Sequence, residues 1–342
     1  MRIERLGDGE GGRWDAWVSP RARTLTDLSG WRQVVRESYG MASHFLFAQD
    51  DAGATRGALA LYEVRHPLLG HSLTTAPFGN DGGLFCDDPG ARDLLLDEAR
   101  KICAERGASH LVIRKRGDDL PGFIADHRYQ TASVALGGGA EALWKRLPGK
   151  TRNQVRRGQK EGFVVSAGPG EAEPFHRVMH AHMRDLGSPA HALRYYQSIA
   201  RHFGDQRARF LVVRDGKTLV AGAMLFLLNG IAANLQTVAL REYNRRCPNY
   251  LLYWTLLEAS CAAGCSEMDL GRSVAGGGNL SFKENWAPSI TKLSYNFHLR
   301  TLRAIPFVDP RNPRYRLPIE AWRRLPLAVT RALGPRLISG LA

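Results

Sequence analysis

The stretch of residues 268–286, MDLGRSVAGGGNLSFKENW, gathers side chains that could take part in chemistry. Its first residues close a short apolar run typical of a buried strand, and we expect residues 271–273 to turn the chain. Three glycines at 276–278 then allow backbone angles that other residues avoid. We expect Asn279 or Ser281 to cap the short helical turn that follows.

This arrangement would place an acid, two cations, hydroxyls and amides at the end of a strand, beside permissive backbone. Loops at strand ends commonly carry function on a rigid scaffold. The groups with the most useful chemistry are Asp269, Arg272, Ser273 and Lys283. The alternative interpretation is a plain glycine-rich loop.

The elements around this stretch predict an α/β (α+β) protein. Residues 1–140 alternate strand-like and helix-like segments, which is typical of this class. Residues 163–299 form a second alternating unit, in which a long apolar helix at 249–263 and a short strand at 267–270 precede the stretch above. Its order of elements does not fit a doubly wound nucleotide-binding fold.

A basic segment at residues 141–162 separates the two units, and we expect two helical pieces broken at Pro148. Arg152, Arg156 and Lys160 recur at every fourth residue and therefore share one helix face, with Lys150 beside it. Two interpretations stay open for this face. It binds phosphate, or it is the solvated side of a linker helix.

Bulk composition favours a folded protein with polyanionic partners. The net charge is +14 and the sequence pI is about 9.9, which suits nucleic acid, anionic lipid or a phosphorylated substrate. Five cysteines without a CxxC pair indicate reduced thiols in a cytoplasm. The N-terminal residues show no apolar core of a secretory signal. The longest apolar run, residues 219–228, is half of the roughly 20 residues that a membrane span needs.

The tail of the chain is basic and rich in proline and carries Trp322. A basic, aromatic-bearing amphipathic segment can rest on an anionic membrane surface at the inner face of the membrane. The preferred alternative is an arm packed across the two domains. The expected domains are therefore 1–140, 141–300 with its basic helical start, and the arm 301–342.

Several common enzyme motifs are missing from the sequence. No GxxxxGK[ST] loop, no GxGxxG after a strand and no GxSxG elbow is present. His176 and His180 are four residues apart on an expected helix, but no HExxH glutamate accompanies them. We therefore expect exposed helix histidines and no metal site.

The order of several segments resembles the FemAB family within the GNAT acyltransferase superfamily. The segments that carry the resemblance are WKRLPGKTRNQVRRGQKEG, RDLGSP, YNRRCPNYLLYWTLLEASCAAGC, DLGRS and FKENW in the second unit, and APFGNDGG in the first. The tail NPRYRLPIEAWRRLPLAVTRALGP is similar to members associated with PEP-CTERM and exosortase systems. Together these segments cover most of the chain.

The resemblance implies two tandem GNAT-like domains, each a mixed, mostly antiparallel sheet flanked by helices. It also implies acyl transfer to an amine, since founding members move an amino acid from aminoacyl-tRNA to a peptidoglycan precursor. The expected acceptor is a phosphorylated sugar or lipid-linked precursor of the cell envelope or exopolysaccharide. A degenerate, non-catalytic fold that binds a sugar phosphate or nucleic acid is the alternative.

The resemblance also assigns residues, because Phe282 and Lys283 match a family pair near the aminoacyl end of the donor. Lys283 would steady the negative charge that develops on the carbonyl oxygen, and Arg272 and Ser273 would hold phosphate or donate a proton. Asp269 is a candidate general base, with Glu284 as the other candidate.

Further substrate contacts are expected around these residues. Asn234 and Gln236 alternate with apolar neighbours on a strand, so both should point to one face and orient substrate amides. Asn249 and Tyr250, at the start of the long apolar helix, complete the expected substrate-binding set.

One segment departs from GNAT enzymes that use coenzyme A, whose pyrophosphate lies on backbone N–H groups of a glycine-bearing loop at a helix N-terminus. The matching segment here, REYNRRCPNY at residues 241–250, contains no glycine. Arg241 and Arg245 would bind phosphate through their side chains instead. No cofactor is expected to be resident, and the co-substrate is left open between acyl-CoA and aminoacyl-tRNA.

Overall fold

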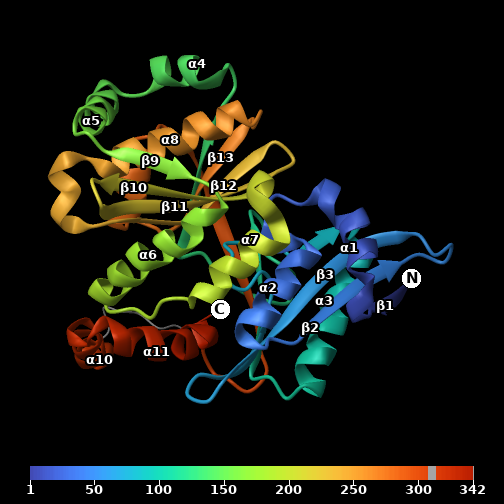
Figure 1. Cartoon of the computed structure of the whole chain (residues 1–342). Coiled ribbons are helices and arrows are strands. Elements are labelled where there is room, and N and C mark those ends of the chain that lie inside the picture. Colours follow the sequence, from blue (N-terminus) through green and yellow to red (C-terminus); the bar gives the residue numbers. More distant parts are fainter. Residues whose placement is uncertain (307–312, 342) are drawn as a thin grey trace. The chain divides into compact units, whose positions relative to one another are not determined.

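The computed structural model describes residues 1–306 and 313–341, and these form two compact units (Figure 1). Unit 1 comprises Met1–Tyr129 with the described parts of Lys292–Val308 and Ser339–Ala342. Unit 2 comprises Gln130–Thr291 and the described part of Asp309–Ile338. No described helix is long and apolar enough to cross a membrane.

Unit 1 contains a mixed sheet with helices and short 3₁₀ turns. Its elements, of which β14 begins in unit 2, are β1 (Arg2–Leu6), η1 (Asp8–Glu10), α1 (Gly11–Val18), η2 (Ser19–Arg21), η3 (Leu25–Asp27), α2 (Ser29–Tyr39), β2 (Ser43–Gln49), β3 (Thr55–His66), β4 (Gly70–Thr74), β5 (Leu84–Cys86), α3 (Pro89–Glu105), β6 (His110–Arg116), β7 (Ile124–Asp126), β14 (Ser289–Leu299) and η6 (Ser339–Leu341).

The strands of unit 1 follow the order β1-β2-β3-β4-β6-β14, with β5 on β3 and β7 on β14. Only the pair β4 and β6 is parallel; the other pairs of described register are antiparallel. Helix α3 places Leu95, Ala99 and Ile102 on this sheet, and these buried side chains form a core with strand residues. Apolar residues at helical spacing thus form one buried face of the helix.

Unit 2 contains a second mixed sheet. Its elements are β8 (Tyr129–Ala135), α4 (Gly139–Arg146), α5 (Gly149–Lys160), β9 (Val164–Ala167), η4 (Pro169–Glu171), α6 (Ala172–Leu186), α7 (Leu193–Arg207), β10 (Ala208–Asp215), β11 (Thr218–Leu228), β12 (Ile231–Ala239), η5 (Arg241–Arg246), α8 (Pro248–Ala262), β13 (Glu267–Val274), α9 (Gly278–Glu284), α10 (Pro313–Arg324) and α11 (Leu327–Ile338).

Helices cover both faces of the unit 2 sheet, whose strand order is β9-β10-β11-β12-β13-β8. Leu225 on β11 belongs to the core that α8 closes. On the other face, a Cβ at Gly222 would lie 2.9 Å from the ring of Phe175 on α6, so that helix packs very close to the strand. The expected class, α/β with mostly antiparallel sheets flanked by helices, is confirmed for both units.

The basic segment forms the two expected helices, α4 and α5, which separate at Pro148 (Figure 1). Thr151, Val155 and Gly158 are the buried residues of α5. A Cβ on Gly158 would lie 2.8 Å from the carbonyl oxygen of Cys247, just before α8. The absence of a side chain at this position therefore lets α5 approach the start of α8.

The C-terminal helices pack against unit 2. Trp322 of α10 donates its indole N–H to the carbonyl oxygen of Ser188, at 3.0 Å. The hydroxyl of Thr330 on α11 lies 3.5 Å from Nε2 of His180 on α6. The following turn, η6, lies against β3 in unit 1. Residues 307–312 and 342 of the expected arm lie outside the described residues.

The compact units do not follow the consecutive ranges expected from the sequence. Residues 130–140 lie in unit 2, and the described part of Lys292–Val308 returns to unit 1, since β14 pairs there with β6 and β7. The pairing of Leu293 with Arg116 joins residues far apart in the chain. Such long-range pairing leaves no local sequence pattern.

The contact between α5 and α8 predicts a specific cost for enlarging Gly158. Replacing Gly158 by Ala should lower the unfolding free energy by about 1–3 kcal/mol, because the new methyl group meets a backbone oxygen that cannot rotate away. Gly149→Ala is the control, since a Cβ there meets nothing within 4 Å. Denaturant titration of both variants is the measurement, and equal stabilities would contradict this packing.

Candidate functional site

Strands β12 and β13 are joined in parallel over only three residue pairs, from Ile231 with Glu267 to Ala233 with Asp269. Beyond these pairs each strand is irregular. The register of β12 against β11 shifts between its pairs at Asn234 and Gln236. On β13, Gly271 has a positive φ of 84°.

Gly271 is required by its surroundings. A Cβ at this residue would lie 2.6 Å from the carbonyl oxygen of Asn234 on β12. The positive φ would also strain any residue with a side chain. The turn expected at residues 271–273 is wrong, because β13 continues through this irregularity to Val274.

Lys283 lies on α9, which begins at Gly278, the last of the three glycines. Its side chain is buried, with 3% exposed, and Nζ donates to the carbonyl oxygens of Gly271 at 2.6 Å and Arg272 at 3.1 Å. Burial lowers the pKa of Lys283 to about 8; the nearby Asp269 carboxylate opposes this shift and Arg272 adds to it. The site thus holds an ammonium group whose proton is weakly bound.

Asp269 is also buried, and its Oδ1 accepts hydrogen bonds from the hydroxyl of Thr131 and from the backbone N–H of Gly271, the latter at 2.7 Å. These contacts fix the backbone beside Lys283. The other expected groups of β13 differ in exposure. Arg272 is exposed, whereas Ser273 is buried and its Oγ has no hydrogen-bond partner.

The prediction that Asn234 and Gln236 share one face of the sheet is wrong. The side chain of Asn234 bonds to that of Thr237 and lies beside Tyr253 of α8. The side chain of Gln236 instead accepts from the hydroxyl of Tyr196 on α7, at 2.9 Å. The register shift inserts an extra residue between the two, which reverses the alternation of side chains.

Asn234 is the member of this pair that lies on the side of Lys283. It is buried, and its Oδ1 has no hydrogen-bond partner in the structure. Its backbone oxygen approaches Gly271, whose own carbonyl holds Lys283. An unpaired buried amide oxygen is costly, and such groups often mark places where a ligand binds.

Four aromatic rings from α8 and the segment that carries Lys283 pack against one another. Tyr253 and Trp286 stack with ring centroids 5.7 Å apart, and Phe282 meets Tyr253 and Tyr250 edge to face at 5.0 and 5.2 Å. Asn249 precedes them in the first turn of α8 and is half-buried. The expected residues Tyr250 and Phe282 are therefore brought together.

Tyr253 and Thr237 were not among the residues expected from the sequence. Burial raises the pKa of Tyr253 to about 12, while hydrogen bonds with Thr237 and Asn234 oppose the shift. Tyr253 follows Tyr250 by three residues and so lies on the same helix face. That spacing was a usable signal, whereas Thr237 joins the site only through the irregularity of β12.

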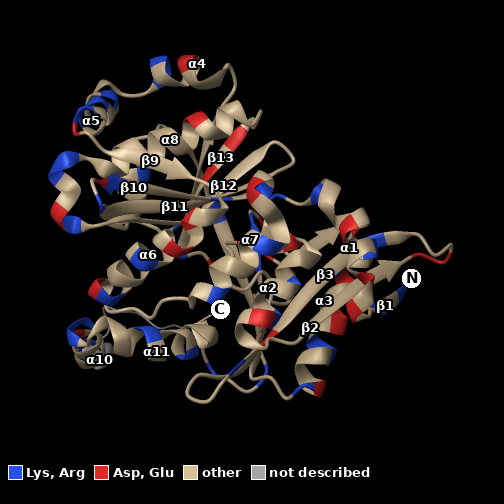
Figure 2. Ribbon diagram, in the orientation of Figure 1, with Lys and Arg blue, Asp and Glu red and all other residues tan. Residues whose placement is uncertain are grey.

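The expected phosphate-binding residues lie on α5 and on η5, the short 3₁₀ helix that precedes α8. Lys150, Arg156, Arg241 and Arg245 are exposed and Arg152 is half-buried. Figure 2 shows the basic residues along α5. These side chains form the basic surface of unit 2.

The segment between β12 and α8 takes its shape without glycine. Cys247 adopts a left-handed conformation, with φ 60°, directly before Pro248 begins α8. Arg246 pairs with Glu161 and Asp215 and lies over the ring of Phe163. Of the cations in this segment, Arg246 therefore has a structural role.

The expectation of exposed histidines on α6 is wrong for two of them. His176 and His180 are buried, with ring centroids 5.8 Å apart, and burial lowers the pKa of His176 to about 4. The described residues contain no group of three or more His, Cys, Asp or Glu side chains arranged to hold a metal ion.

Comparison with known proteins matches this part of the chain to a known domain model. Residues 145–284 match the model described as "Acetyltransferase (GNAT) domain". This range contains α5, β12, α8, β13 and Lys283. No curated protein matches the chain.

Solved structures share the fold at low sequence identity. FemX is 15% identical with a TM-score of 0.65, covering 93% of this chain and 99% of its own. A tandem GNAT protein from the clavulanic acid biosynthesis pathway is 14% identical, with a TM-score of 0.55 and coverage of 87% and 98%. L-PGS from Bacillus licheniformis is 14% identical, with a TM-score of 0.51 and coverage of 93% and 98%.

These likenesses confirm the tandem GNAT-like fold expected from the sequence. The association of the tail with PEP-CTERM systems stays a prediction. Residues 145–284 therefore match a GNAT acetyltransferase domain, and the chain shares its fold with FemX and L-PGS.

Proposed function

We propose that this protein is an N-acyltransferase that forms an amide on an amine of a cell-envelope or exopolysaccharide precursor. The observation that carries the proposal is the buried Lys283 ammonium, held by two carbonyl oxygens where β12 and β13 separate. An ammonium group fixed in a dry environment is suited to stabilise negative charge on a reacting carbonyl oxygen.

The reaction needs few groups from the protein. The neutral amine attacks the donor carbonyl carbon, and negative charge moves to the carbonyl oxygen. Two N–H groups of Lys283 are used by Gly271 and Arg272, so the third can donate to that oxygen. Collapse of the intermediate forms the amide and expels the donor oxygen or sulfur, which takes up the proton lost by the amine.

Other residues of the site would orient the substrates. The unpaired Oδ1 of Asn234 can accept from the attacking amine, and the unpaired Oγ of Ser273 can donate to the donor. Asp269 already accepts two hydrogen bonds in the structure. It is therefore better suited to position Lys283 than to transfer a proton.

The donor would approach over the basic surface of unit 2. Its arginine and lysine side chains suit the phosphates of an aminoacyl-tRNA. The close contact of α5 with the start of α8, and the lack of glycine there, favour phosphate binding by side chains over a backbone cradle for coenzyme A. A phosphorylated sugar or lipid-linked acceptor is the second candidate for this surface.

Removal of the Lys283 amine should abolish most turnover. With wild-type transfer to an amine acceptor as reference, Lys283→Ala should lower kcat by a factor on the order of 10²–10³ while donor binding is largely kept. Lys217→Ala is the control, because Lys217 is exposed at the β10–β11 turn of the same unit. Full activity of Lys283→Ala would refute the assignment of Lys283. A folded wild-type protein that transfers no acyl group would favour the non-catalytic alternative.

The protonation of Lys283 can be tested without substrate. Its pKa of about 8 lies below the ordinary 10.5, so between these values the unfolded chain binds a proton that the folded protein lacks. Relative to Lys283→Met, wild-type stability should therefore rise by roughly 1–3 kcal/mol as pH increases from about 8 to 10.5. A pH-independent difference in denaturant titrations would contradict the buried, perturbed ammonium.

The basic surface predicts a salt-dependent contact with nucleic acid. The triple variant Lys150→Ala, Arg156→Ala, Arg245→Ala should bind tRNA more weakly, and the slope of log K against log salt should fall by roughly 2. The control triple Arg177→Ala, Arg194→Ala, Arg207→Ala removes three exposed arginines from α6 and α7. Equal losses in the two triples would indicate only a general effect of net charge.

A further inference from the structure

The hairpin between β3 and β4 in unit 1 presents two leucines to solvent. Leu68 is 80% exposed and Leu69 is 47% exposed. The turn is held from beneath, because Nδ1 of His66 accepts the backbone N–H groups of Leu68 at 3.1 Å and Leu69 at 3.2 Å. Gly340 of η6 packs against the His66 ring. The leucines are therefore displayed by an ordered turn.

Two further segments of unit 1 meet this hairpin and add exposed leucines. Ser109 connects the hairpin to the segment that ends β14. Its backbone N–H donates to the carbonyl oxygen of His71 on β4, and its carbonyl oxygen accepts from the backbone N–H groups of Arg300 and Thr301. Leu302 follows directly and is exposed, as is Leu341 of η6. We call these four side chains the leucine end: Leu68, Leu69, Leu302 and Leu341.

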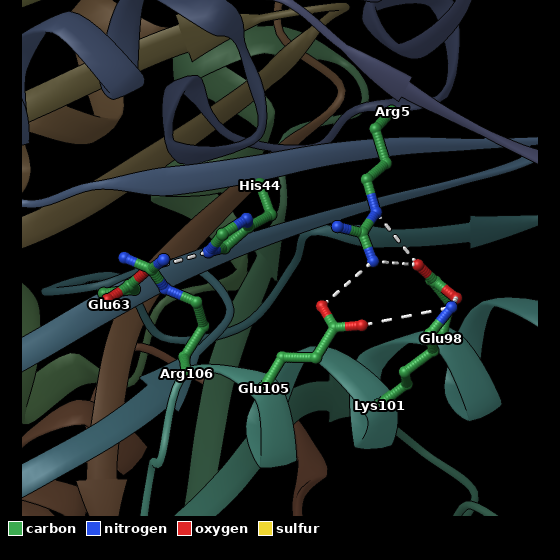
Figure 3. Close-up of polar contacts among 7 residues, drawn as sticks. All are labelled: Arg5, His44, Glu63, Glu98, Lys101, Glu105 and Arg106. Atoms are coloured by element: carbon green, nitrogen blue, oxygen red, sulfur yellow. Dashed lines mark hydrogen bonds and ion pairs between the residues drawn. The ribbon is translucent and has the colours of Figure 1, made fainter.

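Arginines surround the leucine end. Arg65 and Arg106 both bond to the carboxylate of Glu63, at 2.8 and 2.6 Å, and Figure 3 shows Arg106 and His44 at this carboxylate. The Glu63 side chain is buried, whereas those of Arg65 and Arg106 remain about half exposed. Arg300 and Arg303 are also exposed, and they flank Leu302 in the sequence.

The balance of charge at this end is positive. Glu63 stays ionised, because hydrogen bonds from His44, Arg65 and Arg106 outweigh the effect of burial and hold its pKa at about 2. The buried carboxylate of Glu63 thus pairs with two of these arginines, and Arg300 and Arg303 lie outside this ion cluster. Four solvated leucines and an excess of arginine occur together at one end of unit 1.

We propose that the leucine end docks unit 1 on an anionic lipid surface. Leucines on a narrow turn can enter the boundary between headgroups and acyl chains, while arginines around them pair with lipid phosphates. Apolar insertion combined with a basic patch supplies the two signals that stable membrane association needs. The net charge of +14 adds long-range attraction to the same surface.

This surface is different from the two helices of the basic arm, although Leu302 and Leu341 fall within the range 301–342. The arm helices α10 and α11 pack on α6, and the leucine end belongs to unit 1. Leu317 of α10 is as exposed as Leu68, at 80%. The two sites can therefore be compared with matched substitutions. The proposal does not depend on the acyl-transfer reaction.

The test is sedimentation of the full chain with vesicles of phosphatidylcholine, with and without phosphatidylglycerol. The wild type should bind the anionic vesicles and release them at high salt. The double variant Leu68→Glu, Leu69→Glu should lose about tenfold or more in partitioning without a lower melting temperature, since both side chains are exposed. Arg300→Ser with Arg303→Ser should weaken binding and reduce its salt dependence.

Leu317→Glu is the control and should bind like the wild type. The proposal is overturned if the wild type ignores anionic vesicles, or if it binds neutral vesicles equally well. It is also overturned if Leu317→Glu loses binding while the Leu68, Leu69 double variant keeps it, which would assign lipid contact to the arm. Wild-type binding by the Leu68, Leu69 double variant would also overturn it, because the leucines would then not carry the contact with lipid.

Discussion

The site depends on one constraint, the burial of a lysine ammonium against two backbone carbonyl oxygens. A buried cation is tolerated only when its donors are satisfied. Gly271 and Arg272 supply the two acceptors, and they can do so because Gly271 adopts a positive φ and leaves room for the backbone of Asn234. Any side chain at Gly271 would separate β13 from β12.

This constraint organises the neighbouring elements. Asp269 fixes the backbone of Gly271 through one hydrogen bond and reaches β8 through another, to Thr131. The α9 segment that carries Lys283 is closed by Trp286, which stacks on Tyr253 of α8. The α5 helix is tied to the same segment, since the hydroxyl of Thr151 donates to the carbonyl oxygen of Asn285 at 2.7 Å. The basic surface is thus connected to the candidate reactive group.

Local patterns predicted most of the elements, and they failed where the backbone is irregular. The break at Pro148 and the strand at 218–228 needed only turn signals and apolar periodicity. Asn234 and Gln236 were placed on one face because strict alternation was assumed, and one inserted residue reversed it. The return of β14 to unit 1 depends on pairing between distant residues, which no local pattern contains. Lys283 could be singled out, but its burial could not be predicted.

The most direct test of the account is the crystal structure of the protein with a hydrolysis-resistant donor analogue. An amide-linked aminoacyl-adenosine and acetonyl-CoA are the two analogues to compare, and the one that binds should be used. The account predicts that Nζ of Lys283 keeps its two carbonyl partners and lies about 2.7–3.1 Å from the donor carbonyl oxygen. A bound donor whose carbonyl lies away from Lys283, with the lysine unchanged on Gly271 and Arg272, would contradict it.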